Sequence, residues 1–424
     1  MSDHRATRAM PGTSDAPAAM ARPDGVMTRA MSIGRFLPMV LLAYGVCRLL
    51  SGILLSVVAT RQVPTGWTGA VVSYLTFTVQ WDGQWYQTIA QHGYPRVLPV
   101  DQAGQVQQNA WAFYPLFPFL SRALMDLTGF SFYAVGSTLS LLLGFVAAGA
   151  MATLLRPRLG DRWTLATVVL WASMPAAVVL QVAYTEATAM ALLLLFLLAL
   201  QRERWLWGTL LALLLGLARP IALPIAAVAV VALWMRWRRR RADPVSRGEV
   251  VSGLALLAGC GVSGLLWPVV AALVTGRNDA YTVTMSSWRG SREIVPFRPW
   301  LDMSRYYFGQ TWGPVWLTVL FVLIAVMVIG PWAVRLGPQL RVWSLAYPAY
   351  LLVVLDPFTS IFRYLIPLFP LAAVLIGVAG RPLWRRWEGW AWARFGVLLL
   401  AFVVGQWYWI DILWRFVPPT DYPP

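Results

Sequence analysis

Apolar segments long enough to cross a membrane recur along this chain, and they restrict it to very few fold classes. One helical crossing of a bilayer needs about 20 mostly apolar residues. Only 12% of the residues are charged, whereas soluble globular proteins carry about 25%. We therefore predict an all-α integral membrane protein with about 11 membrane segments. The expected segments are 36–60, 132–155, 163–181, 186–201, 206–218, 221–235, 249–274, 312–334, 342–355, 363–380 and 393–414.

The two ends of the chain differ from this apolar domain. Residues 1–35 are rich in Ala, Arg, Pro and Ser and show no apolar periodicity, which predicts a disordered cytosolic tail. Residues 36–415 then form the transmembrane domain, and residues 416–424 form a short outer tail. Cys47 and Cys260 both lie in apolar segments, so we predict neither a disulfide framework nor a cysteine metal motif.

Arginine sets the expected orientation, because all 34 basic residues are Arg. With the N-terminus in the cytoplasm, most Arg residues between segments fall on the cytoplasmic side, as the positive-inside rule requires. Contacts with anionic lipid explain the net charge of +16 without nucleic acid. The loops 61–131 and 275–311 then face outside, and both are long enough to carry function and short helices. A competing topology, in which 113–128 crosses and 207–235 is one span, leaves more Arg outside.

The first outer loop contains the densest polar motif, WDGQWYQTIAQHGYP, at residues 81–95. Asp82 is a carboxylate expected near the outer membrane surface, where solvation is available. The neighbouring Trp81 and Tyr86 suit the stacking of a sugar ring, and His92 is either an acid–base group or a hydrogen-bonding loop residue. Asp82 equally suits the N-cap of a helix, which is a purely structural role.

Other polar residues lie within or next to the apolar segments. AFYPLFPFL contains Tyr114, a candidate substrate-binding residue in a segment that also suits an interfacial helix. In AYTEA, Tyr184 and Glu186 are further substrate-binding candidates, and Glu186 is an intramembrane acid that suggests function or a helix cap. Arg219 lies in an Arg-Pro break that makes 206–218 and 221–235 a broken or re-entrant pair.

Several Arg residues are expected on the outer face, where the positive-inside rule makes Arg scarce. Arg289 and Arg292 in the second outer loop suit a lipid phosphate, because the guanidinium fork matches phosphate oxygens. Arg219 and Arg363 could reach one outward-facing cavity and hold the same anionic group. Packing against lipid headgroups explains the loop residues equally well. Arg48, within the first segment, suits a structural partner for an acid or a carbonyl.

Several signals of other enzymes are missing from the sequence. We find no phosphate-binding Gly-rich loop with a Lys, no His pair with metal-ligand spacing and no Asp-x-Asp in an outer loop. An ATPase and a transferase that uses a soluble nucleotide sugar are therefore disfavoured. We predict that no cofactor and no metal is required.

Taken together, WDGQWYQTIAQHGYP, AFYPLFPFL, AYTEA and FRYLIPLFPL resemble the PIG-V-like mannosyltransferases. The resemblance covers about residues 37–380, and its first motif is the most specific. It implies a GT-C fold, a polyprenyl-phosphate sugar donor and Asp82 as the catalytic carboxylate. It also implies that Tyr86, His92 and Tyr94 lie beside Asp82, and that Glu186 and Arg219 line the same cavity.

The resulting functional hypothesis is an inverting mannosyltransferase at the outer face of the plasma membrane. Asp82 would remove the proton of an acceptor hydroxyl, and Arg side chains would stabilise the departing lipid phosphate. The acceptor is a glycolipid, a lipoglycan or a protein hydroxyl, and the product is α-linked. A GT-C enzyme for arabinose or glucose and a non-enzymatic lipid-linked-sugar flippase remain as alternatives.

Overall fold

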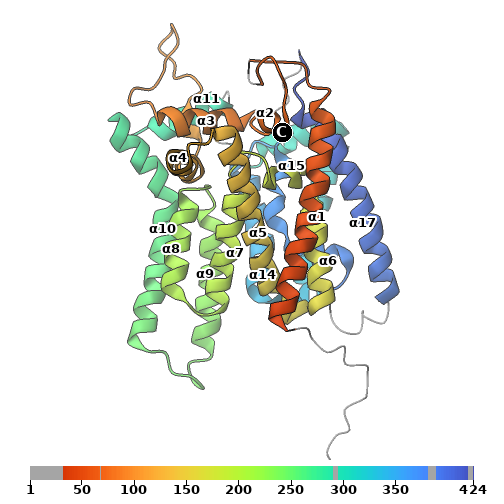
Figure 1. Ribbon diagram of the computed structural model, residues 1–424. Helices are drawn as coiled ribbons and strands as arrows, with labels where there is room; N and C mark the ends of the chain where they lie inside the picture. The colour runs from red at the N-terminus through yellow and green to blue at the C-terminus, as the bar shows by residue number, and fades with distance from the viewer. Residues whose placement is uncertain (1–31, 67, 290–294, 381–387, 419–423) are drawn as a thin grey trace, which may run out of the picture.

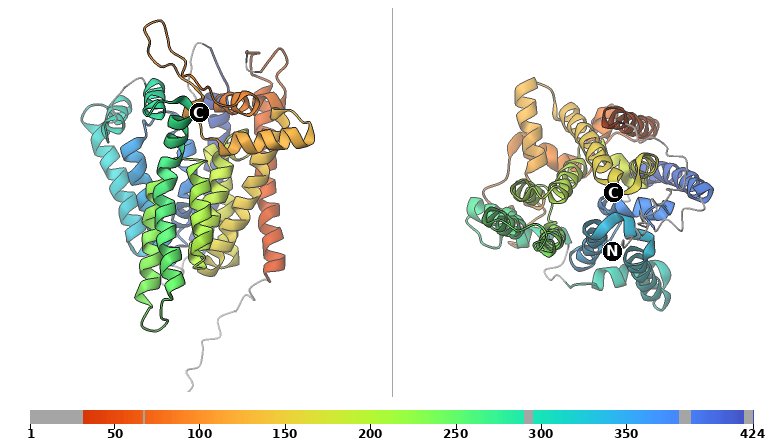
Figure 2. Two further views of the ribbon diagram at one scale, coloured as in Figure 1. Left: turned by 90° about the vertical axis from the view of Figure 1, so that its left-hand side faces the viewer. Right: turned by 90° about the horizontal axis from the view of Figure 1, so that it is seen from below.

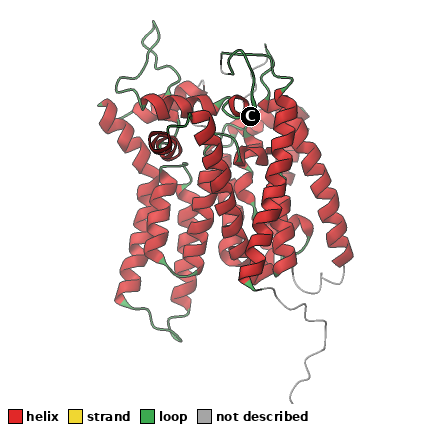
Figure 3. Cartoon of the chain, viewed as in Figure 1, coloured by secondary structure: helices red, strands yellow, loops and turns green. Residues whose placement is uncertain are grey.

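The structure is a computed structural model that describes residues 32–66, 68–289, 295–380, 388–418 and 424. Its described residues are mostly helical, and the β pairing among them is one isolated bridge between Val100 and Val106 (Figure 3). The longer helices are α1 (Ile33–Ala59), α3 (Asp82–His92), α4 (Leu116–Thr128), α5 (Phe132–Leu159), α6 (Asp161–Ala172), α7 (Glu186–Gln201), α8 (Trp205–Gly216), α9 (Ala222–Arg238), α10 (Arg247–Thr275), α11 (Ala280–Arg289), α12 (Arg298–Phe308), α13 (Trp312–Ile329), α14 (Gly337–Val354) and α17 (Glu388–Trp409). The shorter elements are α2 (Tyr74–Phe77), α15 (Ile361–Tyr364), α16 (Pro370–Ile376), the 3-10 turns η1 (Ala110–Ala112), η2 (Pro175–Leu180), η3 (Pro331–Leu336) and η4 (Ile366–Leu368), and the π-helical turn η6 (Ile410–Trp414).

Five stretches of helix among the described residues are long and apolar enough to cross a membrane, which indicates a helical membrane protein. They are Gly34–Ala59, Phe132–Leu159, Arg247–Thr275, Trp312–Ile329 and Glu388–Trp414. The predicted count of about 11 crossings is not confirmed, because the other apolar segments form shorter or interrupted helices. The segment 163–181, for example, changes from α-helix to a 3-10 turn at Pro175, where the proline lacks the N–H that would continue the helix.

Arg48 of α1 explains how this break is tolerated within the apolar bundle. Its guanidinium donates hydrogen bonds to the carbonyl oxygens of Ala172 and Ala177, on either side of the break between α6 and η2. Backbone carbonyls without a partner are costly in an apolar environment. Arg48 therefore has the structural role that its position within the first segment suggests.

The bundle has two different ends. Short helices α3, α4 and α11 lie across the upper end of the upright helices in Figure 1, and a second view shows α4 extending sideways (Figure 2). These elements belong to the loops 61–131 and 275–311, which contain short helices as predicted. They carry Asp82, so the polar motif lies at this end, which we call the loop end.

The opposite end collects the arginine-rich turns. Arg158 at the end of α5 donates to Gln201 at the end of α7 over 2.9 Å. Arg239, just after α9, pairs with Glu203 in the α7–α8 turn. These contacts and Figure 1 place the ends of α5, α7 and α9 together, and we call this the arginine end.

Helix α7 forms the centre of the bundle. Nearly all of its residues are buried, and the helix is apolar on every side. Both properties are expected for a helix that is enclosed by other helices. Helices α5 and α8 pack directly against it. At the next contact outward, Gly216 of α8 lies so close to the backbone of Ser263 in α10 that a Cβ atom would clash there. The buried position of α7 fixes its first residue, Glu186, inside the protein.

Candidate active site

Asp82 is held at the first turn of α3. Its backbone N–H donates to the Tyr184 hydroxyl over 3.2 Å, and its carboxylate Oδ2 lies 2.7 Å from Nη1 of Arg363. The N-cap position belongs to Trp81, which has a positive φ of 58°, a strained conformation for a bulky residue. The side chain of Asp82 therefore pairs with a distant arginine rather than capping its own helix.

Glu186 occupies the equivalent first position of α7. One of its oxygens, Oε1, contacts Arg219 and lies 3.1 Å from Nη1 of Arg363. Of the two capping candidates in this motif, Thr185 at the N-cap makes no side-chain capping bond and instead donates to the carbonyl of Ala218, while Glu186 is the acidic residue of the first turn. Glu186 thus joins two arginines that are far from it in the sequence.

The four side chains form one continuous series, Asp82–Arg363–Glu186–Arg219, which we call the charged chain. It joins α3, α15, α7 and the turn between α8 and α9. Two carboxylates and two guanidinium groups balance, so no net charge is buried. Pairing of this kind is needed because an isolated buried charge is strongly unfavourable.

Exposure distinguishes the members of the charged chain. The side chains of Glu186, Arg363 and Arg219 are 4%, 8% and 11% exposed, whereas Asp82 is 19% exposed. Solvent and small molecules therefore reach Asp82 most readily. A carboxylate that is partly exposed and held in place by a guanidinium suits proton transfer with a ligand hydroxyl.

Aromatic rings pack against both arginines. The guanidinium carbon of Arg363 lies 5.4 Å from the ring centre of Tyr184 and 5.2 Å from that of Tyr364, and Arg219 lies 5.1 Å from Tyr364. Such cation–π contacts hold a guanidinium plane without using its N–H groups. The Arg363 Nε and the Glu186 Oε2 are buried without a hydrogen-bond partner among the described residues.

Tyr86 lies beside the charged chain, within a cluster of aromatic side chains. Its ring centre is 6.4 Å from that of Tyr184 and about as close to Phe113 and Phe117, at 5.4 and 5.3 Å. Burial raises the pKa of Tyr86 well above its usual range, and the nearby negative charges of Asp82 and Glu186 raise it further. Tyr86 is therefore neutral at physiological pH and can act as a donor but not as a base.

Other residues expected beside Asp82 lie elsewhere. His92 is exposed at the opposite end of α3, about 15 Å away along the helix axis at a rise of 1.5 Å per residue. Tyr94 packs against Trp111 and Trp267, with ring centres 4.6 and 4.8 Å apart. The sequence motif is continuous, but the helical rise carries its second half away from the carboxylate.

Trp81 also differs from its expected role as an exposed stacking surface. Its side chain is buried, and its indole N–H donates to the carbonyl of Trp414 over 2.8 Å. Trp414 in turn donates to the carbonyl of Phe77 over 2.9 Å. Trp81 therefore fastens the C-terminal segment over the start of α3.

Tyr114 and Arg289 belong to a second polar group on the side of α11. The hydroxyls of Tyr114 and Tyr281 are 3.1 Å apart. Burial raises the pKa of Tyr281, while its bond with Tyr114 and the positive charge of Arg289 oppose that rise. Arg289 thus acts on Tyr281, and no contact places it on the charged chain. Arg292 lies outside the described residues.

Sequence reasoning did not find several residues of the site. Tyr364 packs on both arginines, and Tyr350 donates to the carbonyl of Pro220 beside Arg219. Tyr364 is part of the FRYLIPLFPL motif, so its position next to Arg363 could have indicated it. Tyr350 and Tyr281 lie in segments that show no such signal.

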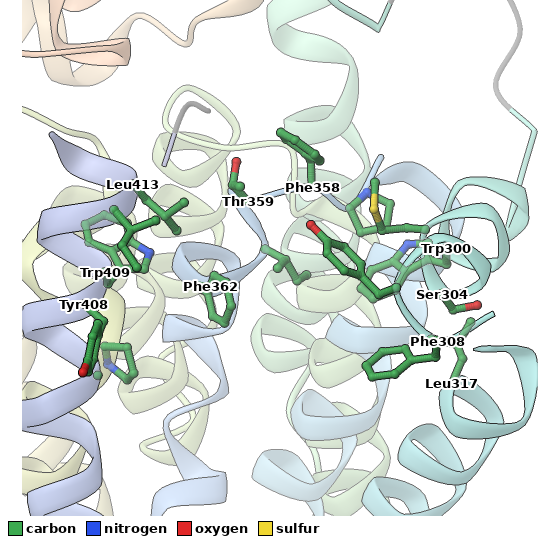
Figure 4. A pocket seen from close by; sticks show the side chains of 17 residues that line it. Trp300, Ser304, Phe308, Leu317, Phe358, Thr359, Phe362, Tyr408, Trp409 and Leu413 are labelled. Atoms are coloured by element: carbon green, nitrogen blue, oxygen red, sulfur yellow. The ribbon is translucent and has the colours of Figure 1, made fainter. Parts of the chain in front are cut away.

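An apolar groove of about 610 Å³ lies next to the charged chain. Figure 4 shows Tyr408, Trp409 and Leu413 on one side, Trp300 and Phe308 on the other, and Phe362 between them. Phe362 directly precedes Arg363 in α15. Trp409 stacks on Trp414, which packs on Tyr184 with ring centres 5.1 Å apart. The groove is therefore linked to the charged chain through Phe362 and through the ring contacts from Trp409 to Tyr184, while none of the four charged side chains lines it.

A metal centre has no set of ligands in the part of the chain that the structure describes. No group of three or more His, Cys, Asp or Glu side chains in that part is placed to hold an ion. The carboxylates and guanidinium groups of the charged chain can themselves supply proton transfer and electrostatic stabilisation. That the reaction requires no metal stays a prediction.

The fold of this chain is similar to that of a solved membrane protein structure. No protein-family model matches the chain, and no curated protein matches it. The crystal structure of the Archaeoglobus fulgidus oligosaccharyltransferase, in complex with Zn and sulfate, aligns with 88% of this chain at 13% sequence identity and a TM-score of 0.45. This chain spans only about half of that protein, 54% of its length. A likeness of this size establishes neither a shared family nor a shared activity.

Proposed function

We propose that the protein is a membrane glycosyltransferase that moves mannose from a polyprenyl-phosphate donor to a hydroxyl of a glycolipid, lipoglycan or protein acceptor. The observation that carries the proposal is the charged chain with Asp82 at its accessible end, linked through Phe362 to an apolar groove. The motif resemblance described above supports the choice of sugar and donor. The loop end would face the outside of the plasma membrane, because the opposite end collects the Arg residues.

The donor would be bound in two parts. Its polyprenyl chain would lie in the groove between α12 and α17, which is lined mainly by aromatic and aliphatic side chains. Its phosphate would then lie near Arg363, at the inner end of the groove. Arg363 uses Nη1 for both carboxylates, and a guanidinium has further N–H groups with which to contact phosphate oxygens.

Asp82 would act as the general base in a single displacement. The acceptor oxygen forms a bond with the anomeric carbon, the bond from that carbon to the phosphate oxygen breaks, and the polyprenyl phosphate leaves with the electron pair. The acceptor proton passes to Asp82, whose Oδ2 is held by Arg363 while Oδ1 remains for the incoming hydroxyl. One displacement inverts the anomeric configuration, and a general base contributes about a hundredfold to ten-thousandfold in rate.

The direct test uses purified protein in proteoliposomes with radiolabelled polyprenyl-phosphate mannose and an acceptor extract. Wild type is expected to transfer label, and Asp82→Asn is expected to lose transfer while keeping its unfolding temperature. The matched control is Asp126→Asn, which removes an exposed carboxylate on α4 that only contacts Arg122. Full transfer by Asp82→Asn would reject the proposed base.

A second readout separates transfer from transport. The same proteoliposomes report whether the labelled donor itself crosses the bilayer. Movement of intact donor without labelled product would favour a flippase over a transferase. Transfer from a glucose or arabinose donor, in place of mannose, would correct the sugar but keep the mechanism.

A further inference from the structure

Two grooves meet at the arginine end of α7, far from the charged chain. One groove, of about 480 Å³, lies between α7 and α8. The other, of about 420 Å³, lies between α7, α1 and α5. Leu195, Leu198 and Arg202 line both of them. The two grooves are thus branches of one surface, which we call the forked groove, with Arg202 at its junction.

The junction carries positive charge without a local acid. Arg202 and Arg204 are exposed, and among the described residues neither guanidinium makes a hydrogen bond or ion pair. Glu203 between them has a positive φ of 56° and contacts Arg239 and Arg236 instead. This turn directs the acid toward α9 and leaves the two flanking arginines at the groove.

The walls of both branches have the character of a lipid-facing surface. Beyond the arginines they consist mainly of Leu, Ala, Val and Phe side chains. Trp207, which is 63% exposed, lies next to the arginines, and Trp is typical of the level of lipid headgroups. The arginines match the phosphate of a phospholipid, Trp207 matches the level of its headgroup, and the two apolar branches match its acyl chains.

We propose that the forked groove binds an anionic glycerophospholipid with two acyl chains, from the leaflet at the arginine end. The phosphate would lie between Arg202 and Arg204, and one acyl chain would follow each branch. A polyprenyl phosphate has a single chain and would fill one branch only. This site is independent of the proposed transfer reaction, because it lies at the opposite end of α7 from Glu186.

The test measures lipid binding to the purified full-length protein by native mass spectrometry and by thermal unfolding. The probes are phosphatidylglycerol and phosphatidylcholine with identical acyl chains. Wild type is expected to bind phosphatidylglycerol more tightly and to gain thermal stability from it, since a ligand of the folded state raises stability. Equal binding of the two lipids would overturn the proposal.

The variants test the arginines and the branches separately. Arg202→Gln/Arg204→Gln is expected to weaken phosphatidylglycerol binding about thirtyfold, because each arginine near an anionic lipid contributes about fivefold. The charge-matched control, Arg241→Gln/Arg247→Gln, removes two exposed arginines of the α9–α10 turn and should change binding less than about twofold. An equal loss in the control would show that only net charge matters and would reject the site.

Gly149→Leu tests the α1–α5 branch without changing charge. A Cβ atom at Gly149 would lie 3.5 Å from Leu37 and 3.7 Å from Leu41, so a larger side chain fits the backbone and fills the branch. Phosphatidylglycerol binding is expected to fall about fivefold or more. The binding of lyso-phosphatidylglycerol, which has one acyl chain, should fall less. Unchanged binding of the two-chain lipid would overturn the two-branched arrangement.

Discussion

Two buried arginines, one at each end of the bundle, illustrate different uses of the same side chain. Arg236 at the arginine end lies 2.9 Å from Glu249 and 3.4 Å from Glu203, and its partners are 31% and 32% exposed. Arg363 at the loop end contacts Asp82 and Glu186, which are 19% and 4% exposed. Solvent therefore helps to stabilise the charges around Arg236, whereas the charges around Arg363 are stabilised mainly by one another.

Sequence distance also separates the two arginines, although both are buried. Arg236 and Glu249 flank one turn, and Ser246 forms a capping box with Glu249 at the start of α10. Arg363 joins residues that precede it by 281 and 177 positions, at Asp82 and Glu186 (363 − 82 and 363 − 186). Arg236 joins the α9–α10 turn to the neighbouring α7–α8 turn, whereas the charged chain positions four separate elements. Only the second arrangement assembles groups suited to chemistry.

The largest expected effect is the loss of Arg363. Arg363→Ala leaves Asp82 and Glu186 without their shared cation, and removing one partner of a buried pair costs about 3–5 kcal/mol. Arg236→Ala should destabilise less, because the carboxylates that contact it are partly solvated. Denaturant unfolding in detergent compares the two variants. A greater loss for Arg236→Ala would contradict the distinction between the two ends.

The next effect separates the two carboxylates of the charged chain. Glu186→Gln leaves Arg219 without a buried anion, so it should lower the free energy of unfolding by about 2 kcal/mol. Asp82→Asn should lower it less, because Asp82 is the more exposed of the two. Transfer kinetics should show the opposite order, with the greater loss of kcat in Asp82→Asn. If Glu186→Gln reduced kcat more at equal stability, the general base would be reassigned.

The smallest effect concerns the apolar groove and leaves the charged chain intact. Phe308→Asp places a charge on the groove wall, whereas Tyr306→Asp places one on the same helix outside the groove. Phe308→Asp should raise the KM for a long-chain polyprenyl donor about tenfold with kcat unchanged. A water-soluble donor with a short prenyl chain should respond little. Equal KM values for the two variants would exclude the groove as the donor-chain site.

The sequence already indicated which residues of the site to consider. Asp82, Glu186, Arg219 and Arg363 each stood out as a charged group in an apolar setting, and the family resemblance placed the first three in one cavity. That signal is strong because a buried charge needs a compensating partner. It does not identify the partner, so pairing of Arg363 with both carboxylates was not among the sequence predictions.

The aromatic residues of the motifs were harder to assign. Trp81, Tyr94 and Tyr114 suit a sugar-binding wall and a packed core equally well by residue type. The structure buries Trp81 against Trp414 and Tyr94 against Trp267, and both contacts bridge distant segments. His92 was misplaced for a simpler reason, since a helix of 11 residues separates its ends by about 15 Å.

By itself, the sequence determined the membrane class, the clustering of Arg in turns and the charged residues that need partners. These properties follow from composition and from the length of apolar segments, which each stretch of chain carries locally. The tertiary structure decided the rest: the broken helices, the order Asp82–Arg363–Glu186–Arg219 and the groove beside it. Those features depend on how helices pack, because their residues come from segments that only the folded bundle brings into contact.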